Sequence, residues 1–322
     1  MILIAGDIGG TKSLIALIRD NADGTKNNAY EKIYQSADYE SIEALLRNFM
    51  IDSGCSDEIV EQIVLAVPGP VTDGVSRLTN LEWVVSEDEL RTLFSIRNVK
   101  IMNDFQATAL GTLSLQPEDY IILNDSHHCE NRTRLVMGAG TGLGMAYLHG
   151  GNDDPCCTPI ATEGGHIDFS PTNEREIELF QYFRKRYERV SYERILSGGG
   201  LAELFCFCAG RTLDDFHISA EWVNREATDE GNPIAQEAIN LFATIYGRFA
   251  GNMVLAFNPG DGLYLTGGVT AKISGWLDSY EFRDAYLDKG RMSDVVKRTP
   301  LYLVTNERVG LQGAIEALKF GF

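Results

Sequence analysis

Two similar segments of the chain, one at its start and one near its middle, constrain the fold more than any other feature. Each consists of an apolar run, a glycine-rich turn and a second apolar run, which predicts two β-strands joined by a tight turn. Residues 2–5 and 14–18 flank the first turn, and residues 135–138 and 144–148 flank the second. A unit that occurs twice predicts two related α/β domains, although two glycine hairpins that are alike by chance would give the same pattern.

The residues after the first pair of strands predict a mixed sheet covered by helices. Gly24 marks a turn to a third strand, and a helix then precedes an apolar run over residues 63–67. The apolar positions of this helix are Ile42, Leu45, Leu46 and Phe49. Two further apolar stripes predict helices in the second half, namely Ile177, Phe180, Phe183 and Tyr187, and Leu241, Phe242, Ile245 and Phe249.

Composition limits the classes of protein that the chain can belong to. Its 322 residues are 44% hydrophobic and 23% charged, which suits a globular protein with room for two domains. No stretch approaches the roughly 20 apolar residues of a membrane-spanning helix, and the start lacks the basic region of a signal peptide, so we expect a cytoplasmic protein. The net charge of −18 repels nucleic acid and anionic membranes.

Both glycine turns are candidates for holding phosphate. Backbone N–H groups can bind a phosphate only where side chains leave room, and glycine provides that room. In GDIGGTK (residues 6–12) an acid can hold Mg²⁺ through water, while Thr11 and Lys12 can reach phosphate oxygens. GAGTGLG (residues 138–144) offers the hydroxyl of Thr141, and a third cluster, LTGGV, again follows an apolar strand. Tight hairpins that bind nothing remain the alternative.

Polar residues near three loops form a candidate sugar site. Asn103 and Asp104 follow a predicted strand over residues 99–102, where a carboxylate can serve as a general base; a helix N-cap is the alternative. Glu163 and His166 lie on the glycine loop EGGH, and Glu193 precedes another glycine run. Carboxylates and amides make the paired hydrogen bonds that recognise vicinal hydroxyls. Taken alone, Glu193 would be a solvated helix acid.

The loop that holds His166 also raises the question of a metal. His166 and Asp168 are two potential ligands, but no third ligand lies nearby in the sequence, so a metal site is disfavoured.

Together these motifs resemble the bacterial-type glucokinases, which belong to the actin-like ATPase superfamily with the hexokinases. The resemblance runs nearly end to end and rests on GDIGGTK, LTNLEWVVS, IMNDF, GAGTGLG, EGGHIDFSP, ERILSGGGL, YGRFAGNMVL, LTGGV, DKGRM and VGLQGA, in this order. It implies a two-domain, α/β, actin-like ATPase fold of the ribonuclease H-like type, with a ligand cleft between the domains. A small domain is expected over residues 1–108 and about 304–322, and a large domain over about 109–303.

The resemblance also implies an activity, the ATP-dependent phosphorylation of glucose to glucose 6-phosphate. Asp104 would be the general base, Mg²⁺ would accompany ATP, and the assembly would be a homodimer. The implied sugar contacts are Asn103, Asp104, Glu163, His166 and Glu193. The implied ATP contacts are Gly6, Asp7, Ile8, Gly9, Gly10, Thr11, Lys12, Gly138, Thr141 and Gly268, and Asp7 would hold Mg²⁺ through water.

The chain departs from the family pattern at one position. Lys12 stands where the most similar glucokinases usually carry Asn, whereas the related repressor and sugar-kinase group more often has Lys. That group also has a Cys-rich zinc motif, which is lacking here, so we expect no zinc. The six cysteines form no CxxC pair and are expected to be reduced; Cys156 and Cys157, just before the EGGH loop, are candidates for oxidant sensitivity.

Two alternative functions share these residues. A kinase for another hexose or an amino sugar would use the same contact types, because epimers differ in a single hydroxyl. A sugar sensor that binds without turnover is the other alternative, and an intact Asp104 with two phosphate turns argues against it.

Overall fold

The computed structural model describes residues 1–20, 26–78, 81–126, 132–151, 154, 157–211 and 218–320, and they form two compact units. The first unit comprises Met1–Gln116, Leu148–Ala161 and Asn306–Phe322, and the second comprises Pro117–Tyr147 and Thr162–Thr305. The domain boundaries at 108 and about 304 stay predictions. The turn predicted at Gly24 lies outside the described residues.

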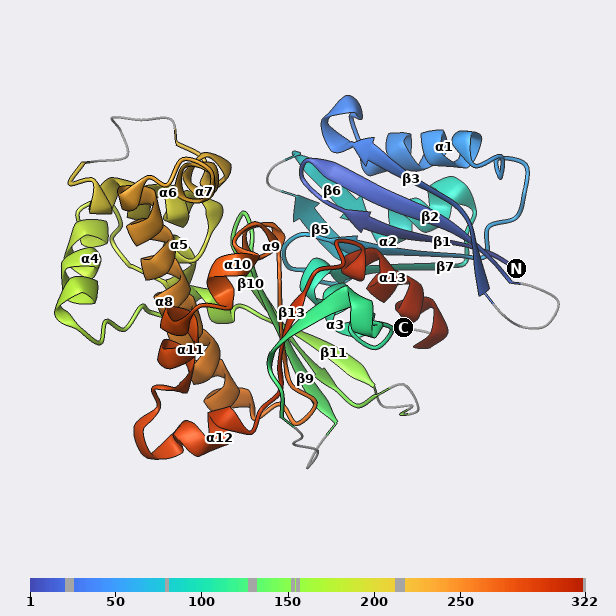
Figure 1. The fold of residues 1–322 in the computed structure, drawn as a ribbon. Coiled ribbons are helices and arrows are strands. Elements are labelled where there is room, and N and C mark those ends of the chain that lie inside the picture. The colour runs from blue at the N-terminus through green and yellow to red at the C-terminus, as the bar shows by residue number, and fades with distance from the viewer. Residues whose placement is uncertain are drawn as a thin grey trace. The chain divides into compact units, whose positions relative to one another are not determined.

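A five-stranded sheet of order β3-β2-β1-β4-β7 forms the core of the first unit (Figure 1). Its strands are β1 (Ile2–Ile8), β2 (Lys12–Asp20), β3 (Lys26–Gln35), β4 (Gln62–Val67) and β7 (Asn98–Asn103). β1 pairs with β2 in antiparallel and with β4 in parallel orientation, and β4 is parallel to β7. The apolar runs of β1 and β4 are buried almost throughout, as expected for central strands covered on both faces.

Helices pack on this sheet in the first unit. They are α1 (Ile42–Asp52), α2 (Glu87–Phe94), α3 (Asp104–Gly111) and α13 (Val309–Phe320), and a two-stranded sheet of β5 (Val75–Leu78) and β6 (Trp83–Ser86) precedes α2. Ser41 caps α1 by accepting a hydrogen bond from the N–H of Ala44. The four apolar positions predicted for α1 are all buried. The predicted order of three strands, a helix and a strand is therefore confirmed.

A second sheet, which belongs mostly to the second unit but includes residues 148–149 and 158–161 of the first unit, repeats the order of the first sheet. Its order is β11-β10-β9-β12-β13-β8, formed by β8 (Tyr120–Asn124), β9 (Thr133–Ala139), β10 (Leu143–His149), β11 (Thr158–Thr162), β12 (Leu263–Thr266) and β13 (Leu301–Val304). Apart from the edge strand β8, each sheet has the order third, second, first, fourth and fifth strand in sequence. β12 is parallel to both β9 and β13, as β4 is to β1 and β7. The predicted repeat therefore extends beyond the glycine hairpins to whole sheets.

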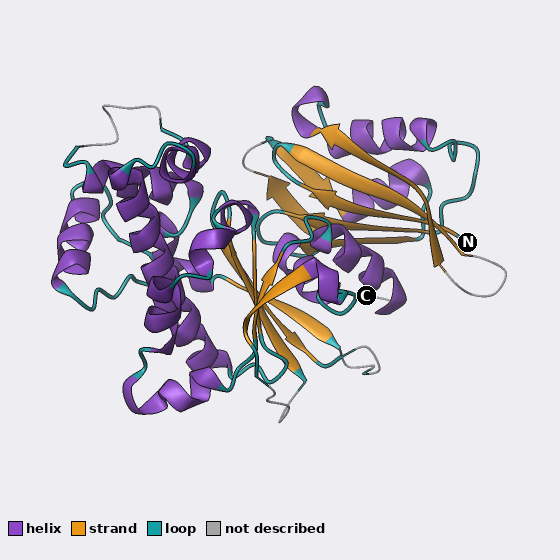
Figure 2. Cartoon of the chain, viewed as in Figure 1, coloured by secondary structure: helices purple, strands orange, loops and turns teal. Residues whose placement is uncertain are grey.

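The longest helix of the second unit, α8 (Pro233–Phe257), lies among the other helices (Figure 2). These are α4 (Glu174–Arg184), α5 (Tyr192–Ile195), α6 (Gly198–Cys208), α7 (Ala220–Thr228), α9 (Gly268–Lys272), α10 (Ser274–Leu277), α11 (Tyr280–Leu287) and α12 (Ser293–Lys297). Asn232 caps α8, and Pro233 occupies its first turn, where no N–H is needed. None of the helices in the described part of the chain combines the length and apolar character needed to cross a bilayer.

The two stripes predicted for the second half had different outcomes. In α8, Phe242, Ile245 and Phe249 are buried as predicted, and Leu241 is partly buried. In α4 the prediction was partly wrong, because Ile177 is 38% exposed and Tyr187 follows the end of the helix.

The buried face of α4 is formed by Glu176, Leu179 and Phe183. Glu176 can occupy this face because Arg248 of α8 neutralises its carboxylate, with Arg248 Nη2 at 3.3 Å from Glu176 Oε1. The N–H of Thr172 donates a hydrogen bond to Glu176 Oε2. The buried ion pair thus allows Glu176, rather than the apolar Ile177 next to it, to lie in the buried face of the helix.

In the first unit, α3 and α13 cross in backbone contact. A Cβ atom at Gly313 would overlap the carbonyl oxygen of Ala107, and one at Gly111 would overlap that of Val309. Glycine is therefore required at both positions for the two helices to approach this closely.

This contact predicts that Gly313→Ala destabilises the protein by at least about 2 kcal/mol, because a methyl group has no room to enter the crossing. Urea unfolding monitored by far-UV circular dichroism measures the loss. Gly275→Ala in α10 is the matched control, since nothing lies within 4 Å of the added atom, and its midpoint should stay near wild type. Equal midpoints for the two variants would contradict the packing argument.

Candidate active site

The register of the first sheet brings Asp7 and Asn103 to the same edge. Asp7 pairs with Ala66 of β4, which pairs with Met102 of β7. All three strands are parallel, so their carboxyl ends meet at one edge, where open α/β sheets bind ligands. Asp104 follows directly as the first residue of α3.

Asn103 is a helix N-cap, which was the structural alternative for this position. Its Oδ1 accepts hydrogen bonds from the N–H groups of Phe105 and Gln106, and the N–H of Asn103 donates to Gln106 Oε1, which forms a capping box. Its Nδ2 donates to Gly69 O at 3.0 Å and to Asp104 Oδ1 at 2.9 Å. The Asn103 amide therefore holds Asp104 in place.

Asp104 is positioned through one of its two carboxylate oxygens. Oδ1 accepts the N–H of Phe105 at 2.9 Å as well as the Asn103 amide. Oδ2 takes part in neither of these two bonds. Oδ1 is therefore fixed by two donors, and Oδ2 is the candidate proton acceptor that a general base needs.

Burial alters the proton affinity of both carboxylates at this edge. Desolvation raises the pKa of Asp7 to about 6. Desolvation and then the nearby charge of Asp7 raise the pKa of Asp104 to about 7, although its hydrogen bonds from Phe105 and Asn103 act in the opposite direction. Two acids with different raised pKa values at a sheet edge are a common feature of catalytic sites.

The start of α13 forms the wall against which Asp7 lies. A Cβ atom at Gly310 would overlap Asp7 Oδ2 and lie 2.9 Å from its Cγ. Only glycine lets the carboxylate approach the first turn of this helix, whose partial positive charge favours an anion. The motif VGLQGA contains Gly310, but the sequence alone assigned this glycine no role.

The first glycine turn is closed by its own backbone. The N–H of Gly9 donates to Lys12 O at 3.0 Å, and a Cβ at Gly9 would lie 2.6 Å from that oxygen. Thr11 and Lys12 are both exposed, so their side chains are accessible to a ligand.

The second glycine turn lies beside the third glycine cluster. Gly138 pairs with Thr266, and a Cβ at Gly138 would lie 2.7 Å from the carbonyl carbon of Thr266. Gly267 has a φ of +98°, and a Cβ atom there would lie only 2.5 Å from Ala139 O. Gly268 therefore starts α9 directly next to this turn. Thr141 is exposed at the turn.

The predicted sugar residues of the second unit gather around His166. Its Nε2 lies 3.8 Å from Glu163 Oε2 and 3.7 Å from Glu193 Oε1. A β-bridge between Asp168 and Ser191 joins the two segments, so Glu193 comes next to His166 although 27 residues separate them. Glu193 is half-buried and contacts the second turn through the N–H of Leu143. It is therefore not the solvated helix acid that its local sequence suggests.

The loop that bears Glu163 and His166 depends on its two glycines. A Cβ at Gly164 would overlap Met145, and one at Gly165 would overlap Leu143 O, so the loop packs directly on β10. This contact places the loop beside the second glycine turn.

A metal at His166 and Asp168 finds no support in the geometry. Asp168 Oδ1 instead accepts a hydrogen bond from Arg189 Nε at 2.5 Å. Among the described residues, no group of three or more His, Cys, Asp or Glu could hold a metal ion.

Of the two cysteines before the EGGH loop, Cys157 is buried and Cys156 lies outside the described residues.

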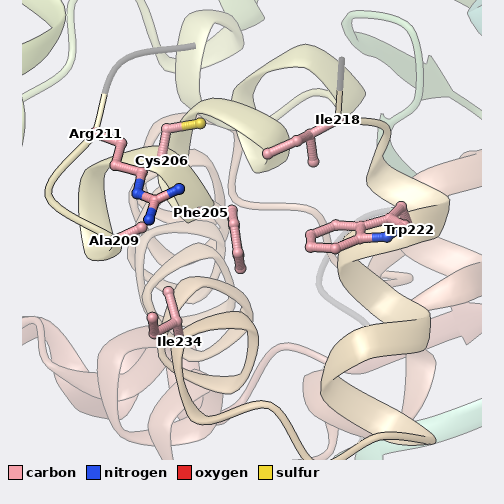
Figure 3. Close-up of a pocket in the computed structure, with 7 residues that line it drawn as sticks. All are labelled: Phe205, Cys206, Ala209, Arg211, Ile218, Trp222 and Ile234. Carbon is pink, nitrogen blue, oxygen red and sulfur yellow. The ribbon is translucent and has the colours of Figure 1, made fainter. Parts of the chain in front are cut away.

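A pocket elsewhere in the second unit has a different chemistry. It has a volume of about 470 Å³ and lies among α6, α7 and the start of α8 (Figure 3). Its lining is Phe205, Cys206, Ala209, Arg211, Ile218, Trp222 and Ile234. The described residues that line it include no carboxylate and none of the predicted ligand residues, so among them there is no acid of the kind that phosphoryl transfer needs.

The structure therefore assembles the predicted residues into two groups, one in each unit. The first unit carries Asp7, the first turn, Asn103 and Asp104, and the second unit carries the second turn, Gly268, Glu163, His166 and Glu193.

Comparisons with known proteins identify the family of the chain. The family model described as Glucokinase matches residues 4–320. The glucokinase of Chromohalobacter salexigens is 37% identical over 98% of this chain and 97% of its own length. The crystal structure of a glucokinase from an Antarctic psychrotroph is 29% identical, with a TM-score of 0.84 over 99% of this chain and 98% of that one.

A more distant neighbour shows likeness of fold alone. It is a ROK family glucokinase from Streptomyces griseus in complex with glucose and AMPPNP, 18% identical with a TM-score of 0.62 over 98% of each chain. These neighbours have the actin-like ATPase fold, which confirms the predicted fold class. Because the family model matches nearly the whole chain and a relative shares 37% identity over almost its full length, the chain belongs to the glucokinase family of sugar kinases.

Proposed function

We propose that this protein transfers the γ-phosphate of ATP to the 6-hydroxyl of glucose, with Asp104 as the general base. The observation that carries the proposal is the Asp104 carboxylate at the sheet edge, with Oδ1 held by two donors and the pKa raised to about 7. A base with this pKa is about half ionised at pH 7, so a large fraction is in the basic form while its affinity for a proton stays high. Phosphoryl transfer requires such a group to orient and deprotonate the attacking hydroxyl.

The sugar assignment is supported by the group around His166. Glu163 and Glu193 each offer a carboxylate within 4 Å of the His166 imidazole, and such groups bind vicinal hydroxyls. The relatives at 30–37% identity are named as glucokinases, which favours glucose over its epimers. Asn103 would contact the sugar only by giving up one of its present hydrogen bonds, so we assign it chiefly to positioning Asp104.

ATP is proposed to bind at the two glycine turns, together with Mg²⁺. The exposed side chains of Thr11, Lys12 and Thr141 are available to phosphate oxygens. Asp7 suits Mg²⁺, because desolvation raises its pKa and a cation nearby would favour its charged form. When bound, Mg²⁺ neutralises charge on the phosphates. A cytoplasmic location, a homodimer and the domain boundaries at 108 and about 304 are proposed from the family resemblance.

The first prediction from the proposed function concerns activity on sugars. ADP release in the presence of ATP and Mg²⁺ should be strong with glucose and weak with mannose, fructose, galactose, glucosamine and N-acetylglucosamine. Asp104→Ala should lower kcat by about 10²–10⁴-fold, because the proton acceptor is lost. A coupled spectrophotometric assay measures both.

Each outcome of this assay has a separate meaning. Higher turnover on another sugar would keep the kinase and overturn glucose as the substrate. Near-normal turnover in folded Asp104→Ala protein would remove Asp104 from the role of base. ATP turnover that no sugar stimulates would overturn the proposed function itself.

The second prediction concerns pH. The pKa of Asp104 is about 7, and its protonated form cannot accept a proton from the hydroxyl. The value of kcat/KM for glucose should therefore fall by about tenfold for each pH unit below roughly 7. Steady-state rates between pH 5 and 9 measure this acid limb, and the residual rate of Asp104→Ala should lack it. A flat wild-type profile down to pH 5 would contradict the assignment.

The third prediction concerns stability. A carboxyl whose pKa is raised on folding destabilises the folded state increasingly as the pH rises from about 4 to about 7. Asp104→Asn removes this penalty and keeps an oxygen for the two donors, so at pH 8 it should stabilise the protein by about 2 kcal/mol. The gain should disappear near pH 4, as measured by chemical unfolding at both pH values.

Asp52→Asn is the control of opposite sign. Lys32 and Tyr34 hydrogen-bond Asp52 and lower the pKa of its carboxyl, so its loss should destabilise the protein at pH 8. Destabilisation by Asp104→Asn at pH 8 would contradict the raised pKa.

A further inference from the structure

Glu193 joins the two ligand groups of the second unit. Its Oε2 accepts a hydrogen bond from the N–H of Leu143 at 3.0 Å, and its Oε1 lies 3.7 Å from His166 Nε2. Leu143 belongs to the second glycine turn, which the proposed function assigns to ATP, whereas His166 belongs to the sugar group. A single carboxylate thus contacts residues with two different assignments.

Gly142 makes this contact possible. A Cβ atom at Gly142 would lie 2.5 Å from Glu193 Oε2 and 3.2 Å from its Cδ, too close for an oxygen and a carbon without movement. The carboxylate would have to move away, and its bond from Leu143 would be lost. Because the obstructed atoms lie at the end of a flexible side chain, the movement would alter the position of the carboxylate far more than the stability of the fold.

We propose that Gly142 and the N–H of Leu143 are positioning groups for Glu193, so that the second glycine turn sets the affinity for the sugar. This inference rests on the proposed function, because it takes Glu193 as a sugar ligand. Its consequence is unusual for a nucleotide turn: one methyl group added at Gly142 weakens the binding of glucose even when no nucleotide is present.

Gly140 provides a matched control within the same turn. A Cβ at Gly140 has its nearest neighbour, the backbone nitrogen of Gly268, at 3.9 Å, which is an ordinary van der Waals distance. The backbone bonds of Gly140, from its N–H to Gly142 O and from Gly198 N to its oxygen, survive the change to alanine. The two substitutions therefore add the same group to one turn, and only Gly142→Ala displaces the carboxylate.

The test is calorimetric titration of the full chain with glucose, without nucleotide. The loss of one hydrogen bond to a charged group lowers binding affinity by about 10- to 100-fold, so Gly142→Ala should raise the Kd of glucose by about 10- to 100-fold. Gly140→Ala should leave the Kd within about twofold of wild type, and both variants should keep the wild-type thermal unfolding midpoint within a few degrees. Equal Kd values for Gly142→Ala and wild type would overturn the inference.

A second variant separates positioning from general damage to the turn. Glu193→Asp keeps the charge, but its shorter side chain no longer reaches the N–H of Leu143 or the space beside Gly142. Adding Gly142→Ala to Glu193→Asp should therefore raise the Kd by less than about twofold, because the carboxylate that the methyl group displaces has already moved. If the two effects instead multiply in full, Gly142 acts through another contact and the inference fails. If wild-type protein binds no glucose, the proposed function fails first, and the inference fails with it.

Discussion

The burial of two acidic side chains at one sheet edge is the constraint on which the first unit depends. Asp7 and Asp104 lie where desolvation raises both pKa values, and the charge of Asp7 adds to the effect on Asp104. Folding must therefore offset an unfavourable electrostatic term at neutral pH, and the apolar core around β1, β4 and α1 provides the opposing free energy. The same desolvation raises the pKa of Asp104 toward neutral pH. The carboxylates that lower the stability of the fold are therefore those that suit the proposed proton transfer.

The repeated sheet order explains how one architecture can carry two kinds of ligand group. In both units the hairpin of the first two strands ends in a glycine turn at the edge where the parallel strands end. At the first edge, Asp7 is the penultimate residue of β1 and Asp104 directly follows β7. At the second edge, Gly138 is the penultimate residue of β9 and Gly267 directly follows β12, and both glycines let the backbones of these strands approach closely. The first edge therefore supplies carboxylates and the second supplies backbone N–H groups and exposed hydroxyls.

The sequence was sufficient for the elements with strong patterns and insufficient for contacts between distant segments. Continuous apolar runs predicted β1, β4 and the two hairpins, and helical spacing predicted α1. The stripe predicted for α4 was partly wrong because a buried ion pair places Glu176 in the apolar face. Glu193 resembles a solvated acid in its own segment, and its partners, Leu143 and His166, come from elements 50 and 27 residues away. A local sequence pattern cannot predict a contact between segments so far apart in the chain. The roles of the individual site residues stay predictions.

Glycine serves different physical purposes at positions that look alike in the sequence. Where the neighbour of a missing Cβ is backbone, as at Gly138, Gly313 and Gly111, the glycine maintains the packing of two elements and a side chain there would act on stability. Where the neighbour is a carboxylate, as at Gly310 and Gly142, the glycine lets an acidic side chain lie against the backbone, and a side chain there would act on the position of the acid. The two carboxylates concerned, Asp7 and Glu193, are both proposed ligand residues. In this fold, the role of each glycine in a motif follows from the atom that its missing Cβ would contact. Room for a phosphate is only one of the reasons why glycine occurs there.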